Sequence, residues 1–254
     1  MIPNNRKAQP FLIQVYNLFL IELTNWRWSW RSMLVVGTIA PLLSMIGLAV
    51  FARDSGEQAL QYVWSGNIVL ALMFGLQNNV AGHFVFMRTE GILNYFATMP
   101  IKKSALVIAV IAAFFVLNIP AVIVTILLGA WLLDLSISLS PILLIAIPLC
   151  ALPMAGIGAF VGSRARNPQE SGAVNLIIMF TMLALGPVLF PPDRLPPVML
   201  ALGQFSPATY AASALRQSLL DQATTQIWLD LGILVITSIV IILIVGRFLD
   251  WRER

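Results

Sequence analysis

The chemistry that this sequence could support rests on a few neutral polar side chains placed inside long apolar runs. These side chains are the carboxamides Asn67, Gln77, Asn78, Asn79, Asn118 and Asn175. A carboxamide both donates and accepts hydrogen bonds. Within lipid, such groups either line a partly hydrated path for a substrate or join helices by interhelical hydrogen bonds, and both interpretations remain open. Asn67 and Asn78 are separated by about three helical turns, which predicts a polar seam on one helix face.

Residues suited to covalent or metal chemistry are sparse. The chain has one histidine, His83, and one cysteine, Cys150, and its acidic residues are scattered. The sequence therefore predicts no metal cluster, no nucleophile–base pair and no intramolecular disulfide. We interpret Cys150 as a small core residue and His83 as an interface histidine rather than a proton relay. A G-x-x-x-x-G-K-[ST] phosphate loop is absent from the sequence, which predicts that this chain is not an enzyme and does not itself hydrolyse ATP.

The composition places these amides in a membrane protein. The 254 residues are 59% hydrophobic and 10% charged, with a mean hydropathy of +0.89. Soluble domains are roughly 45–50% apolar and about 25% charged, so a soluble globular protein is excluded. The net charge of +4 comes from basic residues at the ends of apolar runs, where they set orientation, so we predict contact with membrane lipids and not with nucleic acid.

The predicted fold is an all-α, polytopic transmembrane domain over residues 1–254. Six apolar stretches are close to the roughly 20 residues that cross a bilayer. They are residues 33–51, 63–87, 105–132, 143–162, 172–190 and 228–248. The runs show no strand-like alternation that would indicate a barrel.

Orientation follows from the 15 Lys and Arg residues. With a cytoplasmic N-terminus, the inner set is Arg6, Lys7, Arg27, Arg31, Arg88, Lys102, Lys103, Arg164, Arg166, Arg247, Arg252 and Arg254. Only Arg53, Arg194 and Arg216 then lie outside. This distribution follows the positive-inside rule. It predicts a multi-pass protein of the cytoplasmic membrane with both termini in the cytoplasm; Trp251 would mark the inner interface.

Two predicted elements do not cross the membrane. Residues 11–31 form an apolar stripe and a polar stripe at helical spacing, which predicts a helix lying in the interface plane; the alternative is a tilted extension of the first span. The apolar stripe is Leu12, Val15, Phe19, Leu23 and Trp26, and the polar one is Gln14, Asn17, Thr24 and Asn25. Residues 191–219 are too apolar for an ordinary loop and are broken by Gly203 and Pro207, which predicts a re-entrant or interfacial helical hairpin.

Small residues in the fourth predicted span indicate close helix packing rather than a site. They are Ala151, Ala155, Gly158, Ala159 and Gly162. Such spacing lets two helix backbones approach each other.

The connection after the second predicted span, FMRTEGILNYFATMPIKKSAL, is unusually rich for a short loop. Arg88, Glu90 and Gly91 begin it, and Pro100 ends a stretch that contains Tyr95. Lys102 and Lys103 follow before the next span. The pattern predicts a short amphipathic helix at the membrane surface, with charge available for a protein partner.

With these motifs the sequence resembles the membrane subunits, or permeases, of type-2 ATP-binding-cassette (ABC) exporters. Four residues match the segment that precedes the third span in that family: Glu90, Gly91, Thr98 and Pro100. Five match its pattern near the C-terminus: Pro196, Ser206, Pro207, Tyr210 and Arg216. The resemblance extends over essentially the whole chain.

The resemblance implies a half-transporter. Two six-helix subunits, identical or different, would pair, and each would dock a separate ABC ATPase subunit that carries ATP and Mg, with no cofactor on this chain. Residues 88–103 would act as a coupling helix, through Arg88, Glu90, Gly91, Tyr95, Pro100, Lys102 and Lys103. The substrate path would be lined by the second and fifth spans, with Asn67, Phe74, Gln77, Asn78, Asn175 and Phe180 as candidates. Pro207, Tyr210 and Arg216 would belong to the external re-entrant segment.

The substrate class and one competing function follow from composition. Few aromatic residues lie along the second and fifth spans, which favours a drug-like, lipid-like or glycolipid substrate over a bare polysaccharide. A secondary, ion-coupled transporter is the alternative function. Such carriers keep ionisable residues within the membrane, whereas here nearly all of them fall at span ends or in loops.

Overall fold

The computed structural model describes residues 9–53, 56–138, 140–220 and 224–248. Arg6, Lys7, Trp251, Arg252 and Arg254, which enter the orientation prediction, lie outside the described residues, as does the side chain of Arg53. The described part is all-helical, as predicted, apart from an isolated parallel β-bridge between Ser138 and Leu220.

The central element is a rod of 33 residues that runs from Glu57 to Thr89. It consists of α3 (Glu57–Leu72), a π-helical turn (Met73–Gln77) and α4 (Asn78–Thr89). In the most apolar stretch of this rod, 83% of the residues are buried inside the protein. The corresponding share is 28% in each of the segments Phe11–Ala52 and Gln226–Arg247. Four of the six carboxamides that the sequence marks, together with His83, therefore lie on the most enclosed helix of the bundle.

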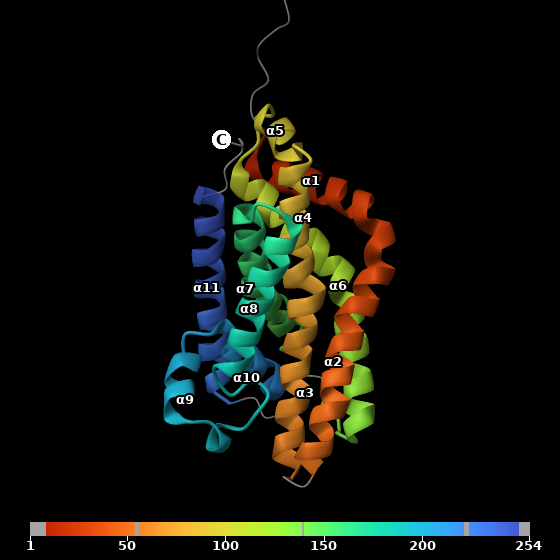
Figure 1. Cartoon of the computed structure of the whole chain (residues 1–254), viewed down its shortest axis with the longest axis vertical. Coiled ribbons are helices and arrows are strands. Elements are labelled where there is room, and N and C mark those ends of the chain that lie inside the picture. Colours follow the sequence, from red (N-terminus) through yellow and green to blue (C-terminus); the bar gives the residue numbers. More distant parts are fainter. Residues whose placement is uncertain (1–8, 54–55, 139, 221–223, 249–254) are drawn as a thin grey trace, which may run out of the picture.

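The other long helices surround this rod. Helix α1 (Phe11–Trp26) crosses one end of the bundle and bends through the turn η1 (Arg27–Ser29) into α2 (Trp30–Arg53), which runs along the rod (Figure 1). Three more long helices complete the bundle: α6 (Lys103–Leu133), α7 (Leu143–Arg164) and α11 (Gln226–Phe248). The short α5 (Ile92–Ala97) lies at the same end as α1 (Figure 1).

Among the described residues, five helical segments are long and apolar enough to cross a membrane: Phe11–Ala52, Glu57–Thr89, Lys103–Leu133, Leu143–Arg164 and Gln226–Arg247. The chain is thus a multi-pass membrane protein, although the six predicted spans are not all reproduced. The fifth predicted span, 172–190, is instead the 17-residue helix α8 (Pro168–Ala184). Its helix stops early because Gly186 takes a φ of 122° and Pro187 cannot donate a backbone hydrogen bond.

After α8 the chain forms short helices in the half of the bundle opposite α5 (Figure 1). They are η3 (Pro192–Arg194), α9 (Pro197–Gly203) and α10 (Pro207–Leu219). Proline occupies the first turn of each, a position where its missing N–H is not needed. The predicted 191–219 segment is therefore helical but broken, and α10 packs against α3, α7 and α11.

A close backbone contact joins α7 to the central rod. A Cβ at Gly158 would overlap the backbone oxygen of Gln77, and a Cβ at Gly162 would overlap that of Ala81. Only glycine permits this approach, so the predicted packing role of these two glycines is confirmed.

We therefore expect Gly158→Ala or Gly162→Ala to destabilise the folded protein by about 1–3 kcal/mol, because the added methyl group must push two backbones apart. The thermal unfolding midpoint in detergent measures this effect. Gly82→Ala is the matched control, since a Cβ there meets nothing within 4 Å. An equal loss in all three variants would contradict the packing argument.

Candidate functional site

Three of the predicted path residues form one chain of hydrogen bonds between the central rod, at the junction of the π turn and α4, and α8. Gln77 Nε2 donates to Asn175 Oδ1 at 2.9 Å. Asn175 Nδ2 in turn donates to Asn78 Oδ1 at 3.2 Å and contacts Met179 Sδ at 3.5 Å. Gln77 and Asn175 are completely buried. Gln77 Oε1 has no hydrogen-bond partner within the described part of the chain, so this amide cluster keeps one acceptor unused.

The π-helical turn helps to place the amide cluster. A π turn holds one residue more than an α-helical turn, so it rotates everything after it relative to α3. The backbone oxygens of Phe74 and Gly75 accept hydrogen bonds from Asn79 Nδ2, at 3.4 and 2.8 Å. Asn79 thus satisfies backbone groups at the turn, while Gln77 and Asn78 bond to α8.

The remaining predicted path residues do not join the amide cluster. Asn67 is buried and donates to Val63 O in its own helix at 2.7 Å. The seam predicted from the spacing of Asn67 and Asn78 is therefore wrong, because the intervening π turn breaks the regular helical count. Phe74 is partly buried, and Phe180 is 60% exposed on α8.

Asn118 of α6 is also separate from the amide cluster. Its side chain fills the space where a Cβ of Gly75 would lie. It packs on the π turn, and within the described residues neither of its amide atoms has a hydrogen-bond partner.

A buried acid–histidine pair was missed by the sequence analysis. His83 Nε2 of α4 lies 2.9 Å from Glu22 Oε2 of α1, and both side chains are about 5% exposed or less. The Trp26 ring meets the His83 ring edge-on at 5.3 Å. The available signal was that the single histidine and Glu22 each interrupt an apolar run; nothing in their spacing pairs them.

The two stripes predicted for residues 11–31 are partly confirmed by which side chains of α1 face the core. Val15, Phe19, Leu23 and Trp26 pack on the core, as the apolar stripe requires. Leu12, however, is 78% exposed, and Gln14 from the polar stripe is buried. Gln14 faces inward because its Oε1 accepts the backbone N–H of Lys102 at 2.9 Å.

The predicted coupling segment contains a shorter helix than 88–103. Arg88 lies in the last turn of α4, and Lys103 begins α6. Only Ile92–Ala97 is helical between them, because Gly91 turns the chain with a φ of 68° and Pro100 prevents the helix from continuing. Leu93 and Phe96 point into the protein, which leaves an exposed face consisting of Glu90, Asn94, Tyr95, Ala97, Thr98 and Pro100.

The ends of this segment are attached to other helices. Arg88 donates from one guanidinium nitrogen to Ser163 O at 3.1 Å and Ala165 O at 3.4 Å. These are carbonyls at the C-terminal end of α7, where a cation is favoured. Lys102 stacks its ammonium group 5.7 Å from the Phe11 ring of α1. Arg88 and Lys102 therefore make internal contacts that the prediction had not assigned to them.

At the opposite end, the predicted external residues belong to α10. Pro207 begins this helix, and Tyr210 donates its hydroxyl to Gln204 O at 2.7 Å. Arg216 lies 3.7 Å from the ring centre of Tyr62 and donates to Ser65 Oγ at 3.3 Å. Burial lowers the pKa of Arg216, while Tyr62 and Asp230 raise it; a guanidinium keeps its charge in proteins.

Among the described residues, no group of three or more His, Cys, Asp or Glu side chains is arranged to hold a metal ion.

Comparison with known proteins gives one family. The model of the family described as "ABC-2 type transporter" matches residues 13–220, which extends from α1 to the end of α10. The comparison with curated proteins gave no match.

The amide cluster leads to a stability prediction. Asn175→Ala should lower the free energy of unfolding by about 0.6–2 kcal/mol, because it removes two interhelical hydrogen bonds and leaves Gln77 and Asn78 unpaired. Thermal unfolding in detergent provides the measurement. Thr181→Ala, at an exposed position of the same helix, is the control. A midpoint equal to that of the wild type would show that the hydrogen bonds contribute nothing.

Proposed function

The chain belongs to the ABC-2 type transporter family, and we propose that it is the permease subunit of an ATP-driven exporter. The family assignment makes it a membrane permease component; in this family, ATP binding lies on partner ABC ATPase subunits. Beyond that, the proposal is that two permease subunits, identical or different, pair with two ATPase subunits. The substrate would move outward from the cytoplasm or the inner leaflet.

The proposed topology has six crossings in the cytoplasmic membrane. The five long helical segments would each cross it, and α8 would be the sixth, although it is short. Basic residues support placing the α1–α5 end in the cytoplasm. In the described residues this end carries Arg88, Lys102, Lys103, Arg164 and Arg166, whereas Arg194 and Arg216 lie toward the other end.

The observation that carries the proposal is that one helix, α4, connects the amide cluster of the proposed substrate path with α5, the proposed docking site of the ATPase. Helix α4 begins at Asn78 in the amide cluster and ends at Thr89, directly before α5. Its 12 residues span about 18 Å. A displacement of α5 by a docked ATPase would therefore reach the contact between α4 and α8 through a single rigid element.

The exposed face of α5 supports an ATPase-docking role. Tyr95 is 62% exposed, and Glu90 precedes it on the outside of the same turn. A large exposed aromatic side chain and an exposed carboxylate in one short segment offer both buried area and a charged anchor to a protein partner. The inward residues Leu93 and Phe96 would hold this face in place while the partner pushes on it.

The amides and the outer face of α8 support a path beside this helix. The α8 face away from the core carries Ile177 and Phe180, which are 67% and 60% exposed. A second permease copy would cover this face, and the path would lie next to the amide cluster. Neutral amides amid apolar side chains suit a drug-like, lipid-like or glycolipid substrate, which needs few polar contacts and no counter-charge.

One test concerns the docking face. Glu90→Ala and Tyr95→Ala are expected to leave the permease folded and to reduce the ATP turnover that it stimulates in a co-purified ATPase subunit. Both side chains are outside the core, so the loss would be one of contact rather than of folding. Asp193→Ala, an exposed acidic position far from α5, is the control. Stimulated ATP turnover that is the same in Glu90→Ala, Tyr95→Ala and the wild type would contradict a docking role for this face.

A second test concerns the path. Asn78→Ala is expected to reduce transport several-fold at equal expression, because Asn78 is the partly exposed member of the amide cluster. Asn67→Ala should retain transport, since Asn67 bonds only within its own helix. Efflux from cells or proteoliposomes measures both. Equal transport in the two variants would show that the amide cluster is not part of the substrate path.

A further inference from the structure

A polar pocket opens at the end of the bundle opposite α5. Its volume is about 510 Å³, and it is lined by Glu57, Gln58, Gln61 and Tyr62 from the first turns of α3 and by Arg216 from α10. Most of the surface around it belongs to apolar helices, so a pocket of this size with almost only polar side chains is unusual there. The predicted coupling segment and the amide cluster have no residue in it.

Counting only partners among the described residues, Arg216 enters this pocket with most of its N–H donors unbonded. A guanidinium has five N–H donors, and one bond to Ser65 Oγ is formed within the described residues. Asp230, the carboxylate whose charge acts on Arg216, is held by Gln217 Nε2 at 3.0 Å. In the described part of the chain no carboxylate lies within 4 Å of the Arg216 guanidinium.

Tyr62 fixes the orientation of this guanidinium. The Tyr62 ring is 8% exposed, and the Arg216 Cζ atom lies 3.7 Å from its centre. Stacking of this kind holds the planar fork in one direction. A charge that is partly withdrawn from water and held in place binds a counter-charge more strongly than a free surface arginine does.

We propose that this pocket binds an anionic group, a phosphate or a carboxylate, through Arg216, with Gln58 and Gln61 as side-chain donors at its mouth. Glu57, whose Oε1 lies 3.5 Å from Gln61 Nε2, places a negative charge at the same mouth and weakens binding. The group could be carried by a lipid headgroup or by a free small anion. In the proposed orientation the pocket faces the outside of the cell.

The test measures ligand stabilisation of the purified permease without any ATPase subunit, so its outcome is independent of the proposed coupling. The thermal unfolding midpoint is followed against added phosphatidylglycerol in uncharged detergent micelles and, separately, against inorganic phosphate. A ligand that binds the folded state raises this midpoint with concentration. A shift with the lipid alone identifies a headgroup site, and a shift with phosphate identifies a site for small anions; both support the proposal.

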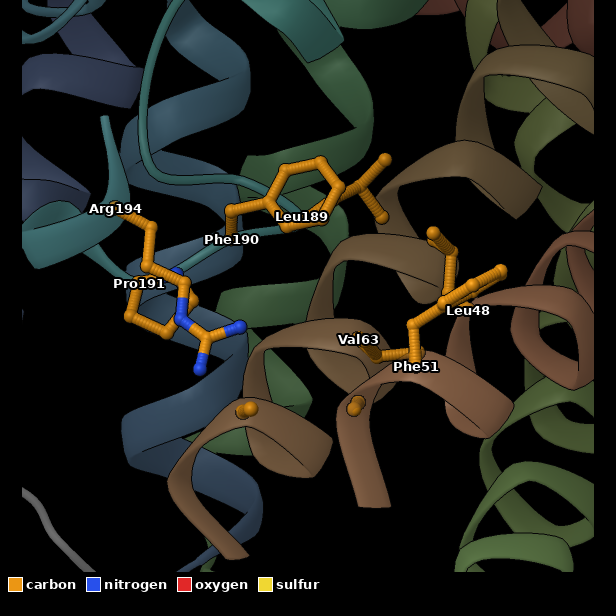
Figure 2. Close-up of a pocket in the computed structure, with 9 residues that line it drawn as sticks. Leu48, Phe51, Val63, Leu189, Phe190, Pro191 and Arg194 are labelled. Atoms are coloured by element: carbon orange, nitrogen blue, oxygen red, sulfur yellow. The ribbon is translucent and has the colours of Figure 1, made fainter. Parts of the chain in front are cut away.

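Three variants locate the binding. Arg216→Gln should lower the apparent affinity by about tenfold or more, because a charge-assisted, bidentate contact is lost. Arg194→Gln is the matched control at the same end. Arg194 lines a different pocket, of about 40 Å³. The other side chains labelled there in Figure 2, such as Leu48, Phe51 and Phe190, are apolar. Glu57→Gln should raise the affinity by about threefold, since it removes a like charge at an exposed position.

Several outcomes overturn the proposal. One is that neither ligand raises the unfolding midpoint of the wild type more than that of Arg216→Gln. That variant has the same non-specific response to salt and so serves as the baseline. Another is an equal loss in Arg194→Gln and Arg216→Gln. If Arg216→Gln does not fold, Glu57→Gln decides: an unchanged or lower affinity in that variant rules out an anion at Arg216.

Discussion

The close approach of α7 to the central rod is the contact on which the rest of the structure depends. Gly158 and Gly162 meet the backbone oxygens of Gln77 and Ala81, so glycines one turn apart on one helix touch oxygens one turn apart on the other. This repeat sets both the distance between the helices and their register. Because Arg88 at the end of α4 also binds the last carbonyls of α7, the two helices are joined along the whole half of the rod that leads to α5.

The π turn gives this fixed rod its functional asymmetry. A regular helix from Glu57 to Thr89 would place its polar residues at a constant angular step. The extra residue in Met73–Gln77 breaks that step between Asn67 and Asn78, so the two amides serve different purposes. Asn67 bonds within α3, whereas Gln77 and Asn78 bond to α8. The side chain of Asn79 stabilises this turn, because it donates hydrogen bonds to the carbonyls of Phe74 and Gly75 inside the enclosed rod.

The features that could be predicted from the sequence are those with a local physical cause. Apolar length identified five of the long helices, and small residues at one-turn spacing identified the face of α7 that packs closely. The π turn was hidden because MFGLQ carries no local signal for an additional residue. The Glu22–His83 pair joins residues 61 positions apart, and no periodicity relates them. The end of α8, in contrast, had a local signal in Gly186 and Pro187. The prediction of a span over 172–190 gave more weight to the apolar run around these two residues.

Helix α1 determines how a push on α5 would spread through the bundle. The chain enters α5 from α4 and leaves it into α6, and α1 is attached to both: Glu22 contacts His83 of α4, and Gln14 accepts the backbone N–H of Lys102 just before α6. The Glu22–His83 contact is buried and the Gln14–Lys102 hydrogen bond is partly buried, so they resist separation more than fully exposed pairs would. The two attachments hold α4 and the start of α6, between which α5 lies, at a fixed separation. In the proposed transporter, a force on α5 would therefore move α4 and α6 together instead of being absorbed by the connecting turns.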